Sequence, residues 1–199
     1  MKYLAIIIGV LFSFSSFTQA DSVKNYYKKI VFGNEFDLTD TTGEYRWKKD
    51  VKIFVMGEKS PELMNELFKI VAELNSLIDP IEIEVVDTKE QSNVVVIFGS
   101  KQDYINYDRS VEQYVKHNEG LFCVYNRGKD LYVGSMYVNV KGGRTSNEMK
   151  HLLREELTQL LGLFNDSYLY RKSIFYQGWT DTTEYAEIDK ELIKMLYNN

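Results

Sequence analysis

The sequence predicts an α+β domain in which helices pack on a mixed β-sheet. Two observations lead to this class. Short apolar or alternating segments typical of strands are interspersed with segments whose apolar residues recur at helical spacing, in the order β-α-β-β-α-β-β-α-α. The chain also lacks an internal repeat, a low-complexity tract or a Pro/Gly/Ser-rich linker that would divide it. We therefore expect one sheet with helices packed on it.

The first half of the domain is expected to form three strands and one long helix. Residues 51–55 predict a strand, and Ser60-Pro61 predicts a helix start, because serine caps a helix and proline suits its first position. One apolar stripe follows, and Asp79-Pro80 ends the helix. Residues 81–85 alternate, which indicates a strand with one wet face. Residues 94–98 are all apolar, which favours a central strand covered on both faces.

Three further regions complete the predicted sheet and its surroundings. Residues 22–50 are aromatic and polar, and we expect them to wrap around the domain. Residues 101–117 favour a helix. Residues 121–125 and 131–140 flank a turn that contains a glycine, and this pattern predicts a β-hairpin.

Two helices are expected to end the chain. Thr145 and Glu148 fit a capping box, and the helix that they begin should run to Leu161. Gly162 then suits the helix C-cap. The last helix is predicted over residues 184–197, whose apolar side chains recur on one side.

The start of the chain has the pattern of a cleaved signal peptide. Lys2 supplies a positive charge, a mostly apolar stretch follows, and Ala20 is a small residue before the polar Asp21. The apolar stretch is shorter than the roughly 20 residues that span a bilayer, so cleavage is favoured over a permanent anchor. We expect residues 1–20 to be the signal peptide and 21–199 to be a single domain. The protein would then be periplasmic or secreted, without a membrane span after cleavage.

Charge and cysteine content argue against nucleic-acid binding and against a cysteine nucleophile. The chain has 24 Lys and Arg against 29 Asp and Glu, and its basic doublets Lys28-Lys29 and Lys48-Lys49 stand apart. Because a nucleic-acid surface needs clustered basic residues, no nucleic-acid partner is expected. Cys123 is the single cysteine, so an internal disulfide is impossible. Its apolar neighbours predict a buried structural thiol and not a nucleophile.

One predicted helix carries the pattern that bears on chemistry. The metzincin peptidase motif is HExxHxxGxxH: three histidines bind zinc, the glutamate is the general base, and the glycine lets the third histidine reach the metal. Laid on this pattern, Glu156 stands at the glutamate and Gly162 at the glycine. Glu155, Gln159 and Asn165 stand at the three histidines. The sequence thus has a degenerate motif, in which the glutamate and the glycine are kept and the three zinc ligands are replaced.

A longer set of segments closely resembles a bacterial family, the domain of unknown function family 2927. These segments are Arg46-Trp47, Glu155 to Gln159, Leu161 to Leu163, Asn165 to Ser167, Ser173 to Phe175 and Asp189 to Tyr197. The resemblance implies a zincin-like fold, and members of the family are similar in having Glu-Glu and Gln where a peptidase has its ligands. It implies no activity. The chain departs from the family at residues 176–178, where an acidic polar stretch is expected.

A helical wheel gives a physical expectation for the two glutamates. The apolar side of this helix is formed by a methionine and four leucines between residues 149 and 160, and Glu156 falls within that arc. Glu155 and Gln159 lie at its edge, one turn apart. We therefore expect Glu156 to be partly buried and Glu155 less so. Glu156 is the candidate catalytic residue, as a general acid or base, and the alternative is a structural carboxylate held by an arginine or a backbone N–H.

The remaining candidates concern metal binding. Glu155, Gln159, Gly162, Asn165 and Asp166 form the candidate cleft around Glu156. Zinc is not expected, because neutral amides are poor zinc ligands, and we predict no cofactor. The oxygen atoms of these side chains could suit a harder ion such as calcium, which stays an alternative.

The two histidines and two later glutamates are not expected to complete a metal site. His117 is expected in a loop, and His151 on the outer, solvated edge of the helix. Glu184 and Glu187 are close enough in sequence to complete a thermolysin-like site, but a histidine pair for them to complete is missing.

Three functions remain open at this point. The leading hypothesis is a non-catalytic pseudo-peptidase of the cell envelope, whose cleft binds a protein or peptide partner or is purely structural. The second is an atypical metal-dependent hydrolase that uses Glu155, Glu156 and Gln159. The third is an assembly factor for an envelope complex, which would present a large exposed aromatic patch away from Glu156.

Overall fold

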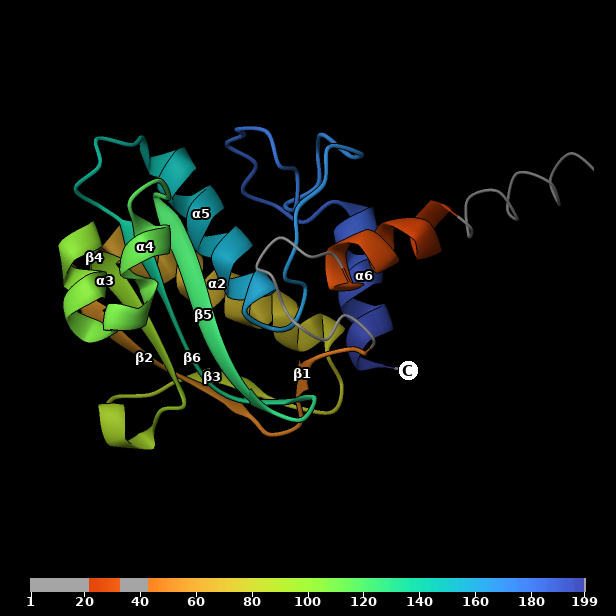
Figure 1. Cartoon of the computed structure of the whole chain (residues 1–199), viewed down its shortest axis with the longest axis horizontal. Coiled ribbons are helices and arrows are strands. Elements are labelled where there is room, and N and C mark those ends of the chain that lie inside the picture. The colour runs from red at the N-terminus through yellow and green to blue at the C-terminus, as the bar shows by residue number, and fades with distance from the viewer. Residues whose placement is uncertain (1–21, 33–42, 199) are drawn as a thin grey trace, which may run out of the picture.

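A mixed six-stranded sheet organises the computed structural model, which describes residues 22–32 and 43–198 (Figure 1). The predicted signal peptide lies outside the described residues. The strands are β1 (Arg46–Trp47), β2 (Val51–Gly57), β3 (Ile83–Val85), β4 (Val94–Gly99), β5 (Gly120–Arg127) and β6 (Asp130–Asn139). The helices are a first one over residues 22–32, then α2 (Pro61–Leu77), α3 (Lys101–Tyr107), α4 (Glu112–Val115), α5 (Ser146–Gln159) and α6 (Glu187–Tyr197). Short 3-10 turns occupy Lys89–Gln91 and Arg109–Val111.

The sheet is parallel except at one edge. β3, β2, β4 and β6 are neighbours in that order, and every pair among them is parallel. β1 adds a short parallel pairing at the start of β6. β5 pairs with β6 antiparallel over almost its whole length, so β5 is an edge strand. The prediction of a mixed sheet with packed helices is confirmed, although the mostly parallel pairing makes mixed α/β a better description than α+β.

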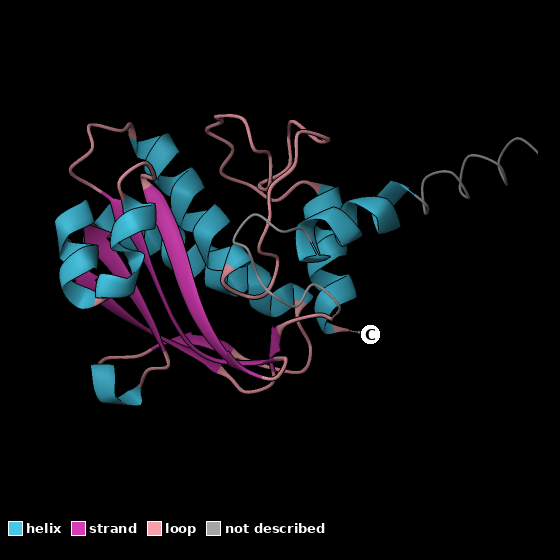
Figure 2. Cartoon of the chain, in the orientation of Figure 1, coloured by secondary structure: helices cyan, strands magenta, loops and turns pink. Residues whose placement is uncertain are grey.

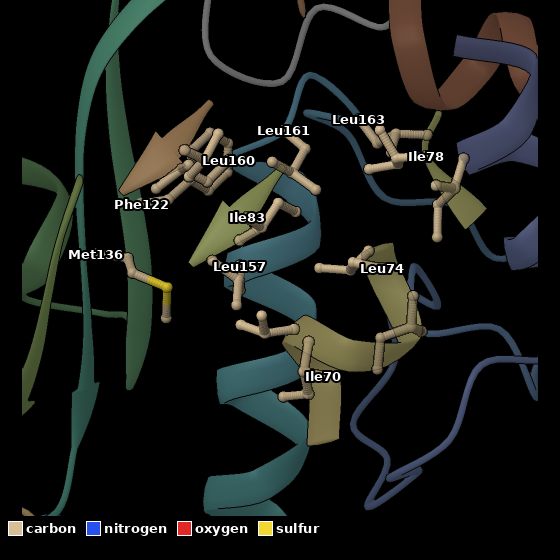
Figure 3. Close-up of a cluster of buried hydrophobic side chains, with 14 of the residues drawn as sticks. Ile70, Leu74, Ile78, Ile83, Phe122, Met136, Leu157, Leu160, Leu161 and Leu163 are labelled. Carbon is tan, nitrogen blue, oxygen red and sulfur yellow. The ribbon is translucent and has the colours of Figure 1, made fainter. Parts of the chain in front are cut away.

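Helices cover both faces of this sheet (Figure 2). The larger core lies between one face and the helices α2, α5 and α6. Figure 3 shows Leu157 of α5 and the leucines just past its end among residues of α2, β3, β5 and β6. A smaller cluster on the opposite face joins β4 and β6 to α3 and α4. All six residues of β4 are buried, which confirms the prediction of a central strand covered on both faces.

The ends of the long helices follow the sequence signals. The side chain of Ser60 accepts from the backbone N–H of Leu63, and Pro61 is the first residue of α2. Thr145 and Glu148 form the predicted capping box of α5. The carbonyl groups just past α5 are satisfied from far away in the chain. Trp47 Nε1 donates to Leu160 O at 3.0 Å, and Tyr197 Oη donates to Leu161 O at 2.7 Å.

Two regions differ from the prediction. Residues 22–32 form a helix whose Tyr26 and Ile30 are fully buried, so this part of the predicted wrapping segment belongs to the core. Residues 101–117 form two short helices instead of one, because Asp108 ends α3 with an extended backbone and caps the following turn. Among the described residues, no helix is long and apolar enough to cross a membrane.

Candidate functional site

An open cleft of about 510 Å³ lies over the middle of α5. Its floor is the side of α5 that carries Glu155, Glu156 and Gln159. The start of β5 and the segment before it form one wall, and residues 176–179 of the long loop between α5 and α6 form the other. The cleft therefore brings together three segments that are distant in sequence.

The two glutamates of α5 are buried to different degrees, as the helical wheel predicted. Glu156 is 7% exposed, and the side chain of Glu155 is 12% exposed. Gly120 of β5 makes room for Glu156, because a Cβ atom at residue 120 would lie 2.7 Å from Glu156 Oε1. A side chain at residue 120 would therefore displace this carboxylate from its place at the cleft.

The other candidate cleft residues divide into two groups. Gln159 and Asp166 line the cleft and contact each other, since Gln159 Nε2 donates to Asp166 Oδ1 at 2.7 Å. Gly162 and Asn165 lie outside the lining. Gly162 has a φ of +119°, and a Cβ atom there would lie 2.1 Å from Tyr45 O, so only glycine fits. The side chain of Asn165 is directed elsewhere and donates to Ile30 O at 2.9 Å, which ties this loop to the first helix.

His151 is buried, and the expectation of a solvated histidine was wrong. It is 3% exposed, because the loop before α6 packs over it and Thr182 O lies 2.8 Å from its Nδ1. A carbonyl oxygen only accepts, so Nδ1 carries the proton of the neutral ring. Nε2 is left 3.4 Å from Glu155 Oε2. Burial lowers the pKa of His151, which favours this neutral form.

The residues at the motif's histidine positions do not fit a zinc ion. Glu155 offers a carboxylate, but Gln159 offers an amide whose nitrogen donates to Asp166, and the side chain of Asn165 contacts Ile30 instead of the cleft. Catalytic zinc sites are built from histidine, carboxylate or thiolate ligands. Across the described ranges, no group of three His, Cys, Asp or Glu side chains is arranged to hold a metal.

The wall formed by the segment before β5 contains an acidic residue that sequence reasoning missed. Glu119 accepts from Asn139 Nδ2 at 2.6 Å and lies 2.8 Å from Lys101 Nζ. Burial acts to raise the pKa of Glu119, but these contacts outweigh it and the pKa is lowered, so the group stays ionised. His117 also lines this wall and lies in a loop, as predicted.

The rim of the cleft holds Trp179, whose role had no signal in the sequence. Trp179 Nε1 donates to Glu148 Oε1 at 2.9 Å, and the guanidinium carbon of Arg144 lies 4.0 Å from the centre of its ring. The indole is nevertheless 54% exposed. The long loop is thus attached to the start of α5 by an aromatic side chain that borders the cleft.

Three other candidates lie away from the cleft. Glu184 and Glu187 are exposed and pair with surface lysines, so neither approaches α5 as a ligand. Cys123 is half-buried on β5, and burial raises the pKa of its thiol. The thiol is thus less buried than the sequence predicted, and its role as a structural thiol stays a prediction.

Two buried polar clusters hold the elements that build the cleft. Arg154, on the face of α5 directed toward α2, is fully buried and forms ion pairs with Glu66 at 2.9 Å and with Glu73. Asp189 of α6 accepts from Ser173 Oγ and from the backbone N–H of Ile174 at 3.0 Å. The first cluster fixes α5 on α2, and the second fixes the long loop on α6.

One sequence family and two solved structures are similar to this chain. No curated protein matches the chain by sequence. Two solved structures of myroilysin are similar to it. One is 9% identical, with a TM-score of 0.48 over 79% of this chain and 87% of that chain. The other is 12% identical, with a TM-score of 0.47 over 85% and 94%. A family model described as a protein of unknown function (DUF2927) matches residues 20–199, and the chain therefore belongs to this family.

Proposed function

We propose that this protein is a non-catalytic, zincin-like binding domain that acts in the periplasm or outside the cell and holds an extended polypeptide in its cleft. The observation that carries the proposal is the position of the cleft at the edge strand β5. Within residues 22–32 and 43–198, β6 is the single strand that pairs with β5. The cleft begins where this strand begins, at Gly120 and Leu121.

An edge strand is suited to a peptide partner. Along its outer edge, every second residue directs its backbone N–H and C=O away from β6. An extended chain can satisfy these groups by adding to the sheet as a further strand, and its side chains then alternate between the two sides. The cleft over α5 would receive those that point toward the helix.

The chemistry of α5 supports binding without cleavage. A metzincin would use three histidines to hold the metal that activates its water, and this chain has a carboxylate and two amides at those positions. The amide of Gln159 is hydrogen-bonded to Asp166, and Asn165 contacts Ile30. The degenerate motif therefore keeps Glu156 at the cleft, with a carboxylate and two amides in place of the three histidines that would hold a metal beside it.

The alternative is an atypical hydrolase, and one observation favours it. Glu156 is 7% exposed and borders an open cleft, and a buried carboxylate in a cleft is a reasonable general acid or base. In that case Glu155 and Gln159 would position the substrate or a metal.

A binding and cleavage experiment on one set of peptides separates the two. A phage library of random dodecapeptides is selected on the immobilised mature protein, and the enriched peptides are synthesised. We expect them to bind and to be recovered intact after prolonged incubation, as judged by mass spectrometry. Two versions of the peptide are then methylated on every second backbone nitrogen, one at the odd positions and one at the even positions. Only one version should lose binding, because strand addition needs the N–H groups of every second residue.

Two results would contradict the proposal. If the selection yields no peptide that binds, the cleft does not hold polypeptides. If a peptide is cleaved by the wild type and not by the Glu156→Gln variant, the hydrolase alternative is correct.

A further inference from the structure

We infer that the groove along β5 has a second compartment, and that the bound segment carries an aliphatic side chain for it and a basic side chain for the cleft. This inference rests on the proposed function and specifies its ligand.

The second compartment is an apolar pocket of about 180 Å³ beside the middle of β5. Its lining includes Leu121 and Cys123, which belong to one face of the strand, and Val124, which belongs to the other. A pocket lined from both faces of a strand lies along the strand's edge. Val111 closes it on one side and Phe164 on the other.

The pocket and the cleft are continuous along the strand. Tyr114 and Leu121 line both of them. The cleft meets β5 at Gly120, and the pocket extends to Val124. A strand advances about 3.3 Å per residue, so the two compartments are separated by roughly two to four residues of an extended ligand.

The two compartments differ in chemistry. Hydrocarbon side chains dominate the pocket, and its volume suits one aliphatic side chain. Four carboxylates line the cleft, from Glu119, Glu155, Glu156 and Asp166. Lys101 pairs with Glu119 at 2.8 Å, and Arg144 is the one permanent cation among the described lining residues, so three carboxylates remain against Arg144. Arg144 is itself placed on the ring of Trp179 and 3.6 Å from Glu148. The cleft is therefore complementary to a positively charged side chain.

These features define the partner as an extended segment in which a lysine or arginine stands roughly two to four residues from a leucine, isoleucine or valine. Any extended segment could pair its backbone with β5, so the aliphatic and the basic side chain would determine which segments bind. An acidic segment, or one that is polar throughout, would be excluded by the carboxylates or would leave the pocket unfilled.

The test uses one enriched peptide and two variants of it, measured by the fluorescence of Trp179 at the rim or by calorimetry. Replacing the aliphatic residue by serine should weaken binding roughly tenfold or more, the loss expected for one buried aliphatic side chain. Replacing the basic residue by glutamate should weaken it by a similar factor, and the effect should shrink as salt is added.

Two measurements on the protein locate the peptide. Cys123 is the single cysteine, so its alkylation by a maleimide is counted directly by mass. Saturating peptide should slow this reaction roughly tenfold, because the ligand would cover the pocket. The Val124→Asn variant should bind the wild-type peptide roughly tenfold more weakly, whereas the matched Val133→Asn variant, on exposed surface of β6 outside the groove, should bind it normally.

The outcomes distinguish this inference from the proposed function. If both peptide variants bind as tightly as the parent while backbone methylation abolishes binding, strand addition is retained and the two-compartment ligand is rejected. Unchanged alkylation of Cys123 at saturation also rejects it, whether or not the Val124 variant folds. Failure of every peptide to bind rejects the proposed function and this inference together.

Discussion

Replacing Arg154 by methionine should destabilise the domain more than any surface substitution. Arg154 is fully buried on α5 and neutralises Glu66 and Glu73 of α2, while its guanidinium also lies 4.5 Å from the ring centre of Tyr185. The side chain of Glu66 is only 9% exposed, so removing the arginine strands a buried carboxylate. Breaking a buried pair in this way costs about 3–5 kcal/mol of unfolding free energy.

The second partner limits that cost. The side chain of Glu73 is 35% exposed and can be rehydrated after the change, so Glu66 should account for most of the loss. In the double variant Arg154→Met with Glu66→Leu, the stranded carboxylate of Glu66 is gone, and we expect recovery of at least half of the lost stability. Lys190→Met, which removes the exposed Lys190–Glu187 pair, is the matched control and should change stability little.

Urea denaturation at neutral pH, followed by circular dichroism, measures these differences. For a domain of this size the single variant should also melt roughly 6–20 °C below wild type. A loss below about 1 kcal/mol, or a double variant as unstable as the single one, would show that the buried network is not what fixes α5 on α2.

The remaining predictions concern the cleft, the loop and the N-terminus. Glu156→Gln should keep the fold, whereas Glu156→Leu should lose about 1–3 kcal/mol by leaving its polar neighbours unsatisfied, which urea melts will show. Burial raises the pKa of Asp189 to about 6. The stabilising contribution of the protonated Asp189 is therefore complete below about pH 4 and is lost as pH rises through 6, a change of about 3 kcal/mol at most. The Asp189→Asn variant should remove this pH dependence. Burial lowers the pKa of His151, so its contribution is present above the usual histidine pKa and is lost as pH falls below it; His151→Gln should flatten the acid side of the same stability profile. Intact mass of the exported protein should correspond to a chain that starts near Asp21, and a mass that includes residues 1–20 would refute signal cleavage.

Local signals predicted most of the regular elements. The serine and proline at the start of α2, the capping box of α5 and the apolar run of β4 each act within a few residues, so their effects can be anticipated from the sequence. The first helix also carries a helical pattern, with Val23, Tyr26, Tyr27, Ile30 and Val31 all buried. Because the segment is also rich in tyrosine and lysine, its composition alone did not indicate a buried helix.

Contacts between distant segments explain what the sequence did not reveal. His151 lies at the edge of the helical wheel, but the loop at Thr182 covers it. Asn165 occupies the position of a metal ligand in the sequence motif, but its side chain donates to the carbonyl of Ile30 in the first helix. Trp47 belongs to a strand of two residues that has no periodicity, and its place at the end of α5 depends on a contact 113 residues away. Such placements depend on topology, which residue spacing does not encode.

The polar residues of α5 show why its cleft should be preformed. Arg154 faces α2, and Thr158 donates to the carbonyl of Arg154 and contacts the hydroxyl of Tyr185 at 2.7 Å. His151 is covered by the loop, and the leucines meet the sheet. The helix is therefore held by α2, the sheet and the long loop, and the stripe of Glu155, Glu156 and Gln159 borders the cleft together with His151 and Leu152. A helix held in this way cannot rotate or shift without breaking a buried charge pair, so a ligand at that stripe should meet a wall that is already in position.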